Sequence, residues 1–241
     1  MKERLESYLE QSNHKLLSKL PVIIHMNGRN FEKLTSLLDK PYSEDLASCF
    51  EFVLNKLCNE LEGCVFGYAF NDELLFILRN DQSRDTQPWY DNKIQKINSV
   101  STSLAIYHFL NSVHSIDLTI LGDPVFITNV FTVPNISEAY NYLIYSQNKN
   151  FIKSLSISLE SELLKLDFNR HEIKEMLKGL SIEERKKLLL EKCDIDYLSY
   201  PSQFRRGIYC SKMSGKFETE YNPGVFVEDK NNILAILSKI Y

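Results

Sequence analysis

Two short polar segments hold the residues of this sequence that could do chemistry together. Asn27-Gly28-Arg29-Asn30-Phe31 follows an apolar run that ends at Met26, and Asp72-Glu73 lies between two further apolar runs. Carboxylate, amide and backbone carbonyl oxygens are ligands that suit Mg²⁺, and amide N–H groups at the start of a helix can hold phosphate oxygens. If the segments meet at one sheet edge, they predict phosphoryl or nucleotidyl transfer with two Mg²⁺ ions. The residues alone equally allow an ordinary hairpin turn, in which aspartate is common.

Hydrophobic patterning predicts the elements that would position these segments. The apolar, β-branched run at residues 20–26 predicts a buried strand that ends at the Asn27-Gly28 turn. The runs at 64–70 and 73–79 flank Asn71-Asp72, a pattern typical of a β-hairpin. A further strand is expected at 125–133. Helices are expected at residues 3–19, 30–38, 43–62, 89–113, 136–166, 169–179 and 181–193 and near the C-terminus, with a second hairpin joining 207–213 to 216–221 through Ser214-Gly215.

The order of these elements predicts an α+β fold. A mostly antiparallel sheet would be backed by helices, with a helical C-terminal extension. We expect one compact domain with two regions. Residues 1–135 would bind nucleotide and metal, and residues 136–241 would form a helical region with a C-terminal hairpin packed on the first.

Composition limits the class of protein. The chain has 241 residues and a formal net charge of -4, which excludes a uniformly basic nucleic-acid coat but not a local basic face. Residues 149–216 hold 14 Lys and Arg against 10 Asp and Glu, whereas the rest of the chain holds 14 against 22. The five cysteines form no C-x-x-C, and no signal peptide or membrane span is recognisable. We therefore expect a cytoplasmic protein with no membrane partner.

Three basic groups are candidates for contact with RNA. Each equally fits a solvated helix face, because phosphate contacts need charge but no base-specific spacing. His25, at the end of the first strand, fits either a hydrogen-bonded strand-end histidine or a phosphate contact. The basic groups are Lys149 with Lys153, Arg185-Lys186-Lys187, and Arg205-Arg206.

Several motifs resemble, in order and spacing, those of the tRNA-histidine guanylyltransferases and their tRNA-repairing relatives. Residues 25–31, His-Met-Asn-Gly-Arg-Asn-Phe, resemble the family signature R-x-D-G-R-x-F, and residues 70–76 resemble its S-D-E-Y-S-F. The resemblance spans residues 18–212. It also includes Lys40-Pro41 (K-P), Gln147 (W-R-Q), Leu177-Lys178-Gly179 (L-x-G), Ile195-Asp196-Tyr197 (I-N-Y) and Phe204-Arg205-Arg206-Gly207 (F-R-K-G).

The resemblance implies a polymerase-palm-like fold and an enzyme that adds a nucleotide to the 5′ end of a tRNA in the 3′-to-5′ direction. GTP and ATP would be substrates, two Mg²⁺ ions the cofactors, and a dimer or tetramer the assembly. Asp72 and Glu73 would be catalytic, and the metal ligands would be Asn27, the Gly28 carbonyl and Asp72. The nucleotide would contact Asn27, Gly28, Arg29, Asn30, Phe31, Lys40 and Asn71.

The chain departs from the family pattern at charged positions. Asn27 stands where the family has its first metal-binding aspartate, and an amide brings no charge to a two-metal site. The family's Pro-x-Phe-Asp-x-Arg segment reads Pro124 to Asn129 here and lacks its Asp and Arg. The W-R-Q-x-D-x-H-x-N-N helix reads Tyr145 to Ser154 and lacks its arginine, aspartate, histidine and asparagines.

These observations support more than one function. The leading hypothesis is a divergent Mg²⁺-dependent nucleotidyltransferase that adds GTP to the 5′ end of tRNA or a related RNA. The alternative is a catalytically impaired family member that acts as a nucleotide- or RNA-binding oligomeric partner. A third hypothesis is a palm-type nucleotide cyclase or nucleotide-signalling enzyme.

Overall fold

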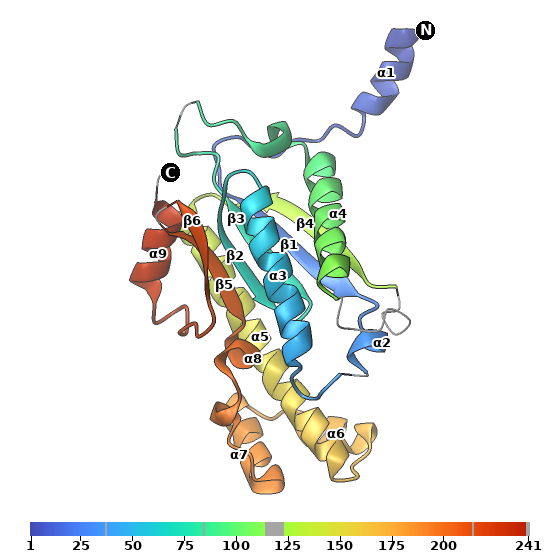
Figure 1. Cartoon of the computed structure of the whole chain (residues 1–241), viewed down its shortest axis with the longest axis vertical. Helices are drawn as coiled ribbons and strands as arrows, with labels where there is room; N and C mark the ends of the chain where they lie inside the picture. The colour runs from blue at the N-terminus through green and yellow to red at the C-terminus, as the bar shows by residue number, and fades with distance from the viewer. Residues whose placement is uncertain (37, 84, 114–122, 214, 240–241) are drawn as a thin grey trace.

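One antiparallel sheet organises the protein. The computed structural model describes residues 1–36, 38–83, 85–113, 123–213 and 215–239. Within them, six strands pair in the order β4-β1-β3-β2-β5-β6, each antiparallel to its neighbours (Figure 1). The prediction of a mostly antiparallel α+β sheet is therefore confirmed. The strands are β1 (Val22–Arg29), β2 (Cys64–Phe70), β3 (Glu73–Leu78), β4 (Val125–Thr132), β5 (Ile208–Met213) and β6 (Lys216–Glu220).

Helices α3 (Glu44–Glu60) and α4 (Ile94–Ser112) cover one face of the sheet (Figure 1). Helix α3 begins at Glu44 because the Ser43 hydroxyl accepts a hydrogen bond from the Leu46 amide, and acidic residues in the first turn suit the helix dipole. Its apolar face recurs every three or four residues and packs against Ile24, Met26 and Phe76 of the strands. These contacts form the larger hydrophobic core.

Helices α5 (Ile136–Lys165) and α9 (Lys230–Ser238) cover the opposite face. Strand side chains alternate between faces, so Ile23 and Leu75 point into this second core while their neighbours point into the first. Helix α5 runs behind the sheet and continues past its edge (Figure 1). There it packs with α6 (Arg170–Leu177) and α7 (Ile182–Cys193), close to the short α8 (Ser202–Arg206), and this is the predicted helical extension.

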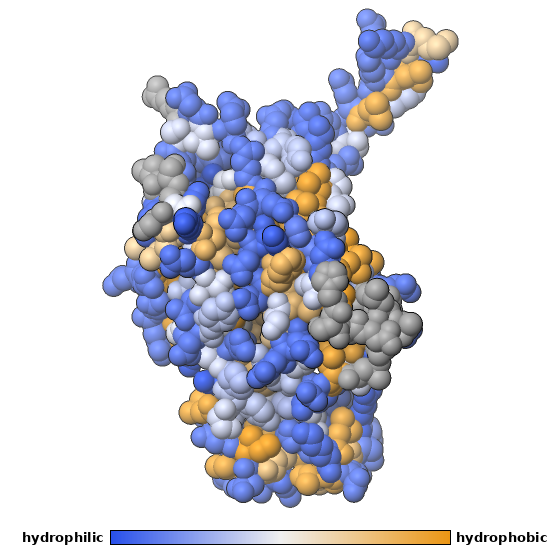
Figure 2. All heavy atoms as spheres, viewed as in Figure 1, coloured by the Kyte–Doolittle hydropathy of each residue, from blue (hydrophilic) through white to orange (hydrophobic). Residues whose placement is uncertain are grey.

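Some predicted boundaries were wrong. The N-terminal helix α1 covers only Lys2–Glu10 and buries none of its residues, so its apolar side chains lack the packing that would extend a helix to residue 19. It projects from the body, and Figure 2 shows hydrophobic residues on it. Strand β1 does not turn at Asn27-Gly28, because β4 pairs with it as far as Arg29. Helix α2 is a single turn (Glu32–Thr35), and a 3₁₀ turn (Trp89–Asn92) precedes α4.

The other predicted strands and helices are confirmed within about two residues. Of the predicted Ser214-Gly215 turn, Ser214 lies outside the described residues. The division into residues 1–135 and 136–241 stays a prediction, although β5 and β6 of the second region complete the sheet of the first. No helix among the described residues combines the length and apolar character needed to cross a membrane.

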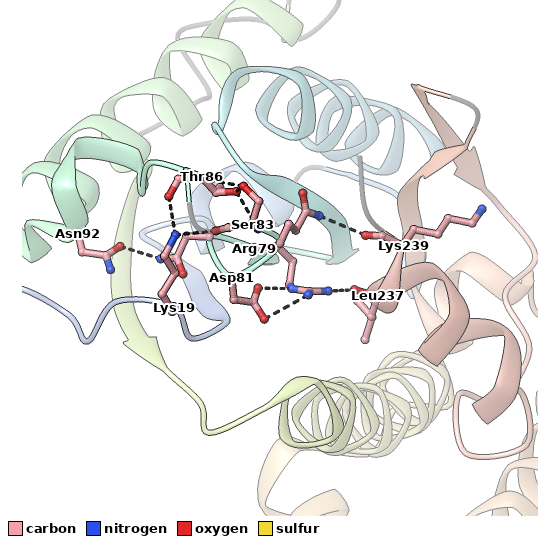
Figure 3. Close-up of polar contacts among 10 residues, drawn as sticks. Lys19, Arg79, Asp81, Ser83, Thr86, Asn92, Leu237 and Lys239 are labelled. Atoms are coloured by element: carbon pink, nitrogen blue, oxygen red, sulfur yellow. Dashed lines mark hydrogen bonds and ion pairs between the residues drawn. The ribbon is translucent and has the colours of Figure 1, made fainter.

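Arg79 anchors the C-terminal helix to the end of β3 (Figure 3). Its guanidinium is buried, donates two hydrogen bonds to the Asp81 carboxylate and donates a third to the Leu237 carbonyl in α9. Nearby, the Lys19 ammonium donates to the carbonyls of Ser83 and Thr86 at 2.8 and 2.9 Å. Hydrogen bonds from Arg79 and from Lys19 therefore hold the loop after β3 at both of its ends.

We expect Arg79→Ala to lower the free energy of unfolding by about 2–3 kcal/mol, because it leaves a partly buried carboxylate and the Leu237 carbonyl without their donor. Urea unfolding measures the loss. Arg170→Ala is the control, because Arg170 lies 3.7 Å from Glu160 in an exposed pair that should contribute less than about 1 kcal/mol. Equal losses in the two variants would contradict an anchoring role for Arg79.

Candidate active site

The two polar segments meet where β1 and β3 lie side by side. Asn27 is paired with Glu73 in the antiparallel ladder, and the Gly28 amide donates a hydrogen bond of 2.8 Å to the Asp72 carbonyl. The expected convergence of both segments at one sheet edge is therefore observed. The hairpin turn at Asn71-Asp72 places Asp72 just outside the ladder, where its side chain is 30% exposed.

A cavity of about 290 Å³ opens beside this junction. Its apolar wall includes Phe31, Phe50 and Ile208, and its polar rim includes Lys153 and Gln203. A cavity of this size and mixed character is typical of a small-molecule site. Predicted nucleotide-binding or catalytic residues that line it are Gly28, Asn30, Phe31, Lys40, Asn71 and Asp72.

Two glycines of the recognised motifs permit close packing around the cavity. A Cβ on Gly28 would lie 2.7 Å from the Phe31 ring and 2.8 Å from the Asp72 Cβ, so only glycine lets the strand approach both. Gly207 has φ +78°, and a Cβ there would lie 2.4 Å from the Ala69 carbonyl oxygen. Gly207 therefore allows α8 to end against β2, next to Ile208 in the cavity wall.

Phe31 and Asn30 hold the loop after β1 in place. The Phe31 ring is 4% exposed and packs against Phe50, Phe109 and Phe126 with centroid distances of 5.1–5.7 Å. Asn30 adopts a left-handed backbone conformation that asparagine tolerates, and its side-chain amide donates to the Asp123 carbonyl at 3.1 Å. Both residues thus shape the cavity in addition to lining it.

Asp72 and Glu73 are neighbours in sequence but occupy different surroundings. Asp72 lines the cavity, and its Oδ1 lies 3.1 Å from the Lys153 Nζ. Glu73 is 2% exposed and does not line the cavity. Of the two predicted catalytic residues, the structure therefore brings only Asp72 to the cavity, because the first residue of β3 points to the face that α5 covers, and a catalytic role for Glu73 stays a prediction.

Glu73 belongs to a buried polar network between the sheet and α5. One carboxylate oxygen lies 3.0 Å from His25 Nε2, and the other accepts a hydrogen bond of 2.9 Å from the Lys149 ammonium. His25 Nδ1 lies 2.8 Å from the Tyr142 hydroxyl. Burial alone would raise the pKa of Glu73, but contacts with His25 and Lys149 outweigh burial and hold that pKa below its usual value. His25 thus has the hydrogen-bonded role among its two expected ones, although it lies within β1 and not at its end.

Besides Glu73, two residues predicted to bind nucleotide lie outside the cavity lining. Asn27 is half-buried, and strand alternation places it on the face of His25 and Glu73. Arg29 is exposed at the end of β1. Contacts of either residue with a nucleotide remain a prediction.

The predicted RNA-binding residues all have partners within the protein. Lys149 and Lys153 pair with Glu73 and Asp72, so they do not form an open basic stripe. The remaining contacts are Arg185 to Ser156, Leu177 and Leu180, Lys186 to Glu183, Lys187 to Glu191, Arg205 to Tyr200, and Arg206 to Pro223. Exposed pairs such as Lys187–Glu191 are weak and can exchange for phosphate contacts, so RNA binding stays a prediction.

The residues present do not fit a pair of Mg²⁺ ions. Such a site needs several carboxylate oxygens facing one space. Here the cavity lining holds Asp72, which already has an ammonium partner, and Asp39 on a separate loop. Asn27 is neutral, and Glu73 is buried between two basic groups. Among the residues that the structure describes, no three His, Cys, Asp or Glu residues cluster in a way that could hold a metal ion.

Sequence reasoning missed the partners that α5 brings to this site. The sequence pattern indicates no role for Tyr142, and it predicts only RNA contact for Lys149 and Lys153. Their spacing of one helical turn, opposite two consecutive acidic residues, was the available signal. Gln147, recognised as part of a motif, has a structural role, because its amide donates to the Gly224 carbonyl at 3.1 Å and its oxygen accepts from the Phe226 amide at 2.7 Å.

Comparison with known proteins assigns the fold. A bacterial tRNA(His) guanylyltransferase (Thg1)-like protein in complex with ATP has a TM-score of 0.87 at 23% identity, covering 100% of this chain and 98% of that one. A similar bacterial protein in complex with GTP has a TM-score of 0.78 at 21% identity, covering 99% of each chain. The structure thus has the fold of the tRNA(His) guanylyltransferase-like proteins, as predicted.

Sequence comparison assigns the family. The family described as tRNAHis guanylyltransferase (Thg1) matches residues 2–134, more than half of the chain, so this protein belongs to it. tRNA(His) guanylyltransferase 1 of Arabidopsis thaliana is 22% identical over 190 residues, 77% of this chain but only 33% of the relative. The Candida glabrata tRNA(His) guanylyltransferase is 21% identical over 213 residues, 82% of this chain and 84% of the relative. This chain therefore spans about a third of the Arabidopsis relative.

Gly28→Ala should destabilise the fold by about 1–3 kcal/mol, because the added methyl group forces Phe31 or the strand to move. Urea unfolding measures the change. Gly224→Ala is the matched control, since its Cβ would meet nothing within 4 Å. A Gly28 variant as stable as the Gly224 variant would show that Phe31 and the strand can move to accommodate the methyl group without loss of stability.

Glu73→Gln should reveal a pH-dependent contribution to stability. Because the folded-state pKa of Glu73 lies below its ordinary value of 4.5, its carboxylate stabilises the fold above that pH, and the stabilisation is lost as the pH falls through the folded-state pKa. At neutral pH, we expect the free energy of unfolding of the variant to be about 3 kcal/mol lower than that of the wild type. This difference should narrow below pH 4.5.

The measurement is urea unfolding of both proteins across this pH range. Glu3→Gln on the exposed helix α1 controls for the change in net charge and should track the wild type. If the difference in free energy of unfolding between the wild type and Glu73→Gln stayed constant with pH, the stabilisation by Glu73 would not be electrostatic.

Proposed function

We propose that this protein binds a nucleoside triphosphate in the cavity beside Gly28 and Asp72 and transfers a nucleotide to the 5′ end of a tRNA or a similar RNA. The observation that carries the proposal is the cavity itself, which lies at the junction of the two family motifs. Family membership supports the reaction class, and solved proteins of the same fold are complexes with ATP and GTP.

The cavity lining offers both apolar and cationic groups to a nucleotide. The apolar wall formed by Phe31, Phe50 and Leu46 suits a base. The rim carries the ammonium groups of Lys40 and Lys153, which suit phosphate oxygens. A triphosphate laid across the rim would bring its phosphates next to Asp72.

Nucleotidyl transfer would join the 3′-hydroxyl of the incoming nucleotide to the phosphorus of an activated RNA 5′ end. The new oxygen–phosphorus bond replaces the bond to the leaving group, which is pyrophosphate for a 5′-triphosphate or AMP for an adenylylated end. Asp72 is the cavity-lining carboxylate beside Gly28, and it can orient the hydroxyl and accept its proton. Lys153 and Lys40 would offset charge on the phosphates. Because the donor set does not fit two Mg²⁺ ions, no step is assigned to a metal.

The RNA would lie along the helical extension. Residues 149–216 carry more basic than acidic side chains, in contrast to the rest of the chain. The exposed Lys187 and the half-buried Lys186 of α7 can exchange their partners on the same helix for phosphates of an RNA backbone. A homo-oligomer and a cytoplasmic location remain the accompanying expectations.

A second candidate function is a catalytically impaired family member that retains nucleotide or RNA binding and acts as an oligomeric partner. The observation that favours it is the loss of charge at Asn27 together with the pairing of both hairpin carboxylates by lysines. The two candidates differ in turnover, which an assay can measure.

The test incubates the protein with labelled GTP, ATP and a 5′-truncated tRNA, with and without Mg²⁺. We expect transfer by the wild type and a loss of at least about 100-fold in Asp72→Asn, which removes the proton acceptor. Asp45→Asn is the control, because Asp45 is an exposed first-turn residue of α3 outside the cavity lining.

Equal activity in Asp72→Asn and Asp45→Asn would overturn the assignment of Asp72. Transfer by Asn27→Asp alone, with none by the wild type, would overturn catalysis by this chain and support the impaired partner.

A further inference from the structure

The described residues pair each hairpin carboxylate with a lysine from one helix. Lys153 Nζ lies 3.1 Å from Asp72 Oδ1, and Lys149 Nζ lies 2.9 Å from Glu73 Oε2. The two lysines are one turn apart on α5, so their side chains leave the same face of the helix. The consecutive residues Asp72 and Glu73 thus pair with lysines on two successive turns of α5.

We propose that these two ammonium groups take the place of divalent metal ions, so that the protein binds a nucleoside triphosphate without a divalent cation. The proposal rests on the proposed nucleotide-binding role of the cavity. Lys153 would contact the phosphates, and Lys149 would neutralise Glu73 behind it.

Lys153 is placed to bridge Asp72 and a phosphate. Its side chain lines the cavity and remains 42% exposed, although its Nζ already contacts Asp72. An ammonium has three N–H donors, so one can bind the carboxylate while the others bind phosphate oxygens. A metal ion bound between a carboxylate and a triphosphate provides the same bridge of positive charge.

The ion pair with Lys149 makes the Glu73 carboxylate unavailable as a metal ligand. The Glu73 side chain is 3% exposed and contacts His25 on one oxygen and Lys149 on the other. Releasing Glu73 to a metal would remove the carboxylate that lies 3.0 Å from the buried His25 ring and would leave the half-exposed Lys149 ammonium without its acceptor, which costs free energy. Among the described residues that line the cavity, Asp72 is then the carboxylate beside Gly28, and Asp39 is the other acidic residue of the lining.

The changes in formal charge agree with this exchange. Against the motif letters given above, Asn27 replaces an aspartate, Lys149 replaces an aspartate and Lys153 replaces an asparagine. These exchanges add one, two and one positive charges in turn. The same motifs lose arginines at positions 25, 129 and 146, so the net gain is smaller, but the structure places both added lysines on the hairpin carboxylates.

The experiment measures the binding of ATP and of GTP by isothermal titration calorimetry, once with excess EDTA and once with excess Mg²⁺. We expect wild-type Kd values that differ by less than about tenfold between the two conditions. Lys153→Met keeps a side chain of similar length but removes the ammonium group. It should weaken nucleotide binding in EDTA by about tenfold or more.

Lys165→Met is the matched control, because Lys165 lies on the same helix and pairs with Glu162 at 2.9 Å, away from the cavity lining. It should bind nucleotide as the wild type does. The double variant Asn27→Asp with Lys153→Asn should bind nucleotide well only when Mg²⁺ is present. Urea unfolding of each variant establishes that it is folded.

Wild-type binding that requires Mg²⁺ would overturn this proposal and leave the proposed function intact. Failure of the wild type to bind either nucleotide in both conditions would overturn the nucleotide-binding role itself. Equal affinity of Lys153→Met and Lys165→Met in EDTA would overturn the role of Lys153.

Discussion

The antiparallel pairing of β1 with β3 is the constraint on which the site depends. The hydrogen bond from the Gly28 amide to the Asp72 carbonyl closes this pairing at its end and sets the distance between the two polar segments. That closeness is possible because residue 28 has no side chain to collide with Phe31 or Asp72. The aromatic cluster around Phe31 then supports the loop from the other side. Backbone geometry and core packing therefore form the cavity edge, and charged side chains are not needed for it.

Helix α5 supplies most of the chemistry around that edge. It crosses the sheet face and carries Tyr142, Lys149 and Lys153 toward His25, Glu73 and Asp72. Small and polar residues such as Ser146, Asn150 and Ser154 are fully buried along it, which allows the helix to lie close to the strands. One rigid helix thus links the hydrophobic second core, the buried polar network and the cavity rim.

Buried charge explains why two adjacent carboxylates have different roles. Glu73 is removed from water and is tolerable as an anion because His25 and Lys149 contact both of its oxygens. Asp72 lies in the turn, keeps partial contact with water and faces the cavity. The first is suited to holding the sheet and α5 together, whereas the second is available to a ligand.

The amino-acid sequence by itself determined the strands, the main helices, the Asn71-Asp72 hairpin and the family motifs, because these depend on local periodicity, turn chemistry and residue order. It also identified Gly28 and Asp72 as neighbours, since adjacent strands bring their ends together. It could not limit α1 to nine residues, because that end depends on the extended segment of residues 14–16, which pairs with residues 92–94 and packs Leu16 against the core. Nor could it separate Asp72 from Glu73, or direct Lys149 and Lys153 onto them rather than toward solvent. Only the tertiary structure decided those points, because they depend on where α5 crosses the sheet and on which groups that crossing removes from water.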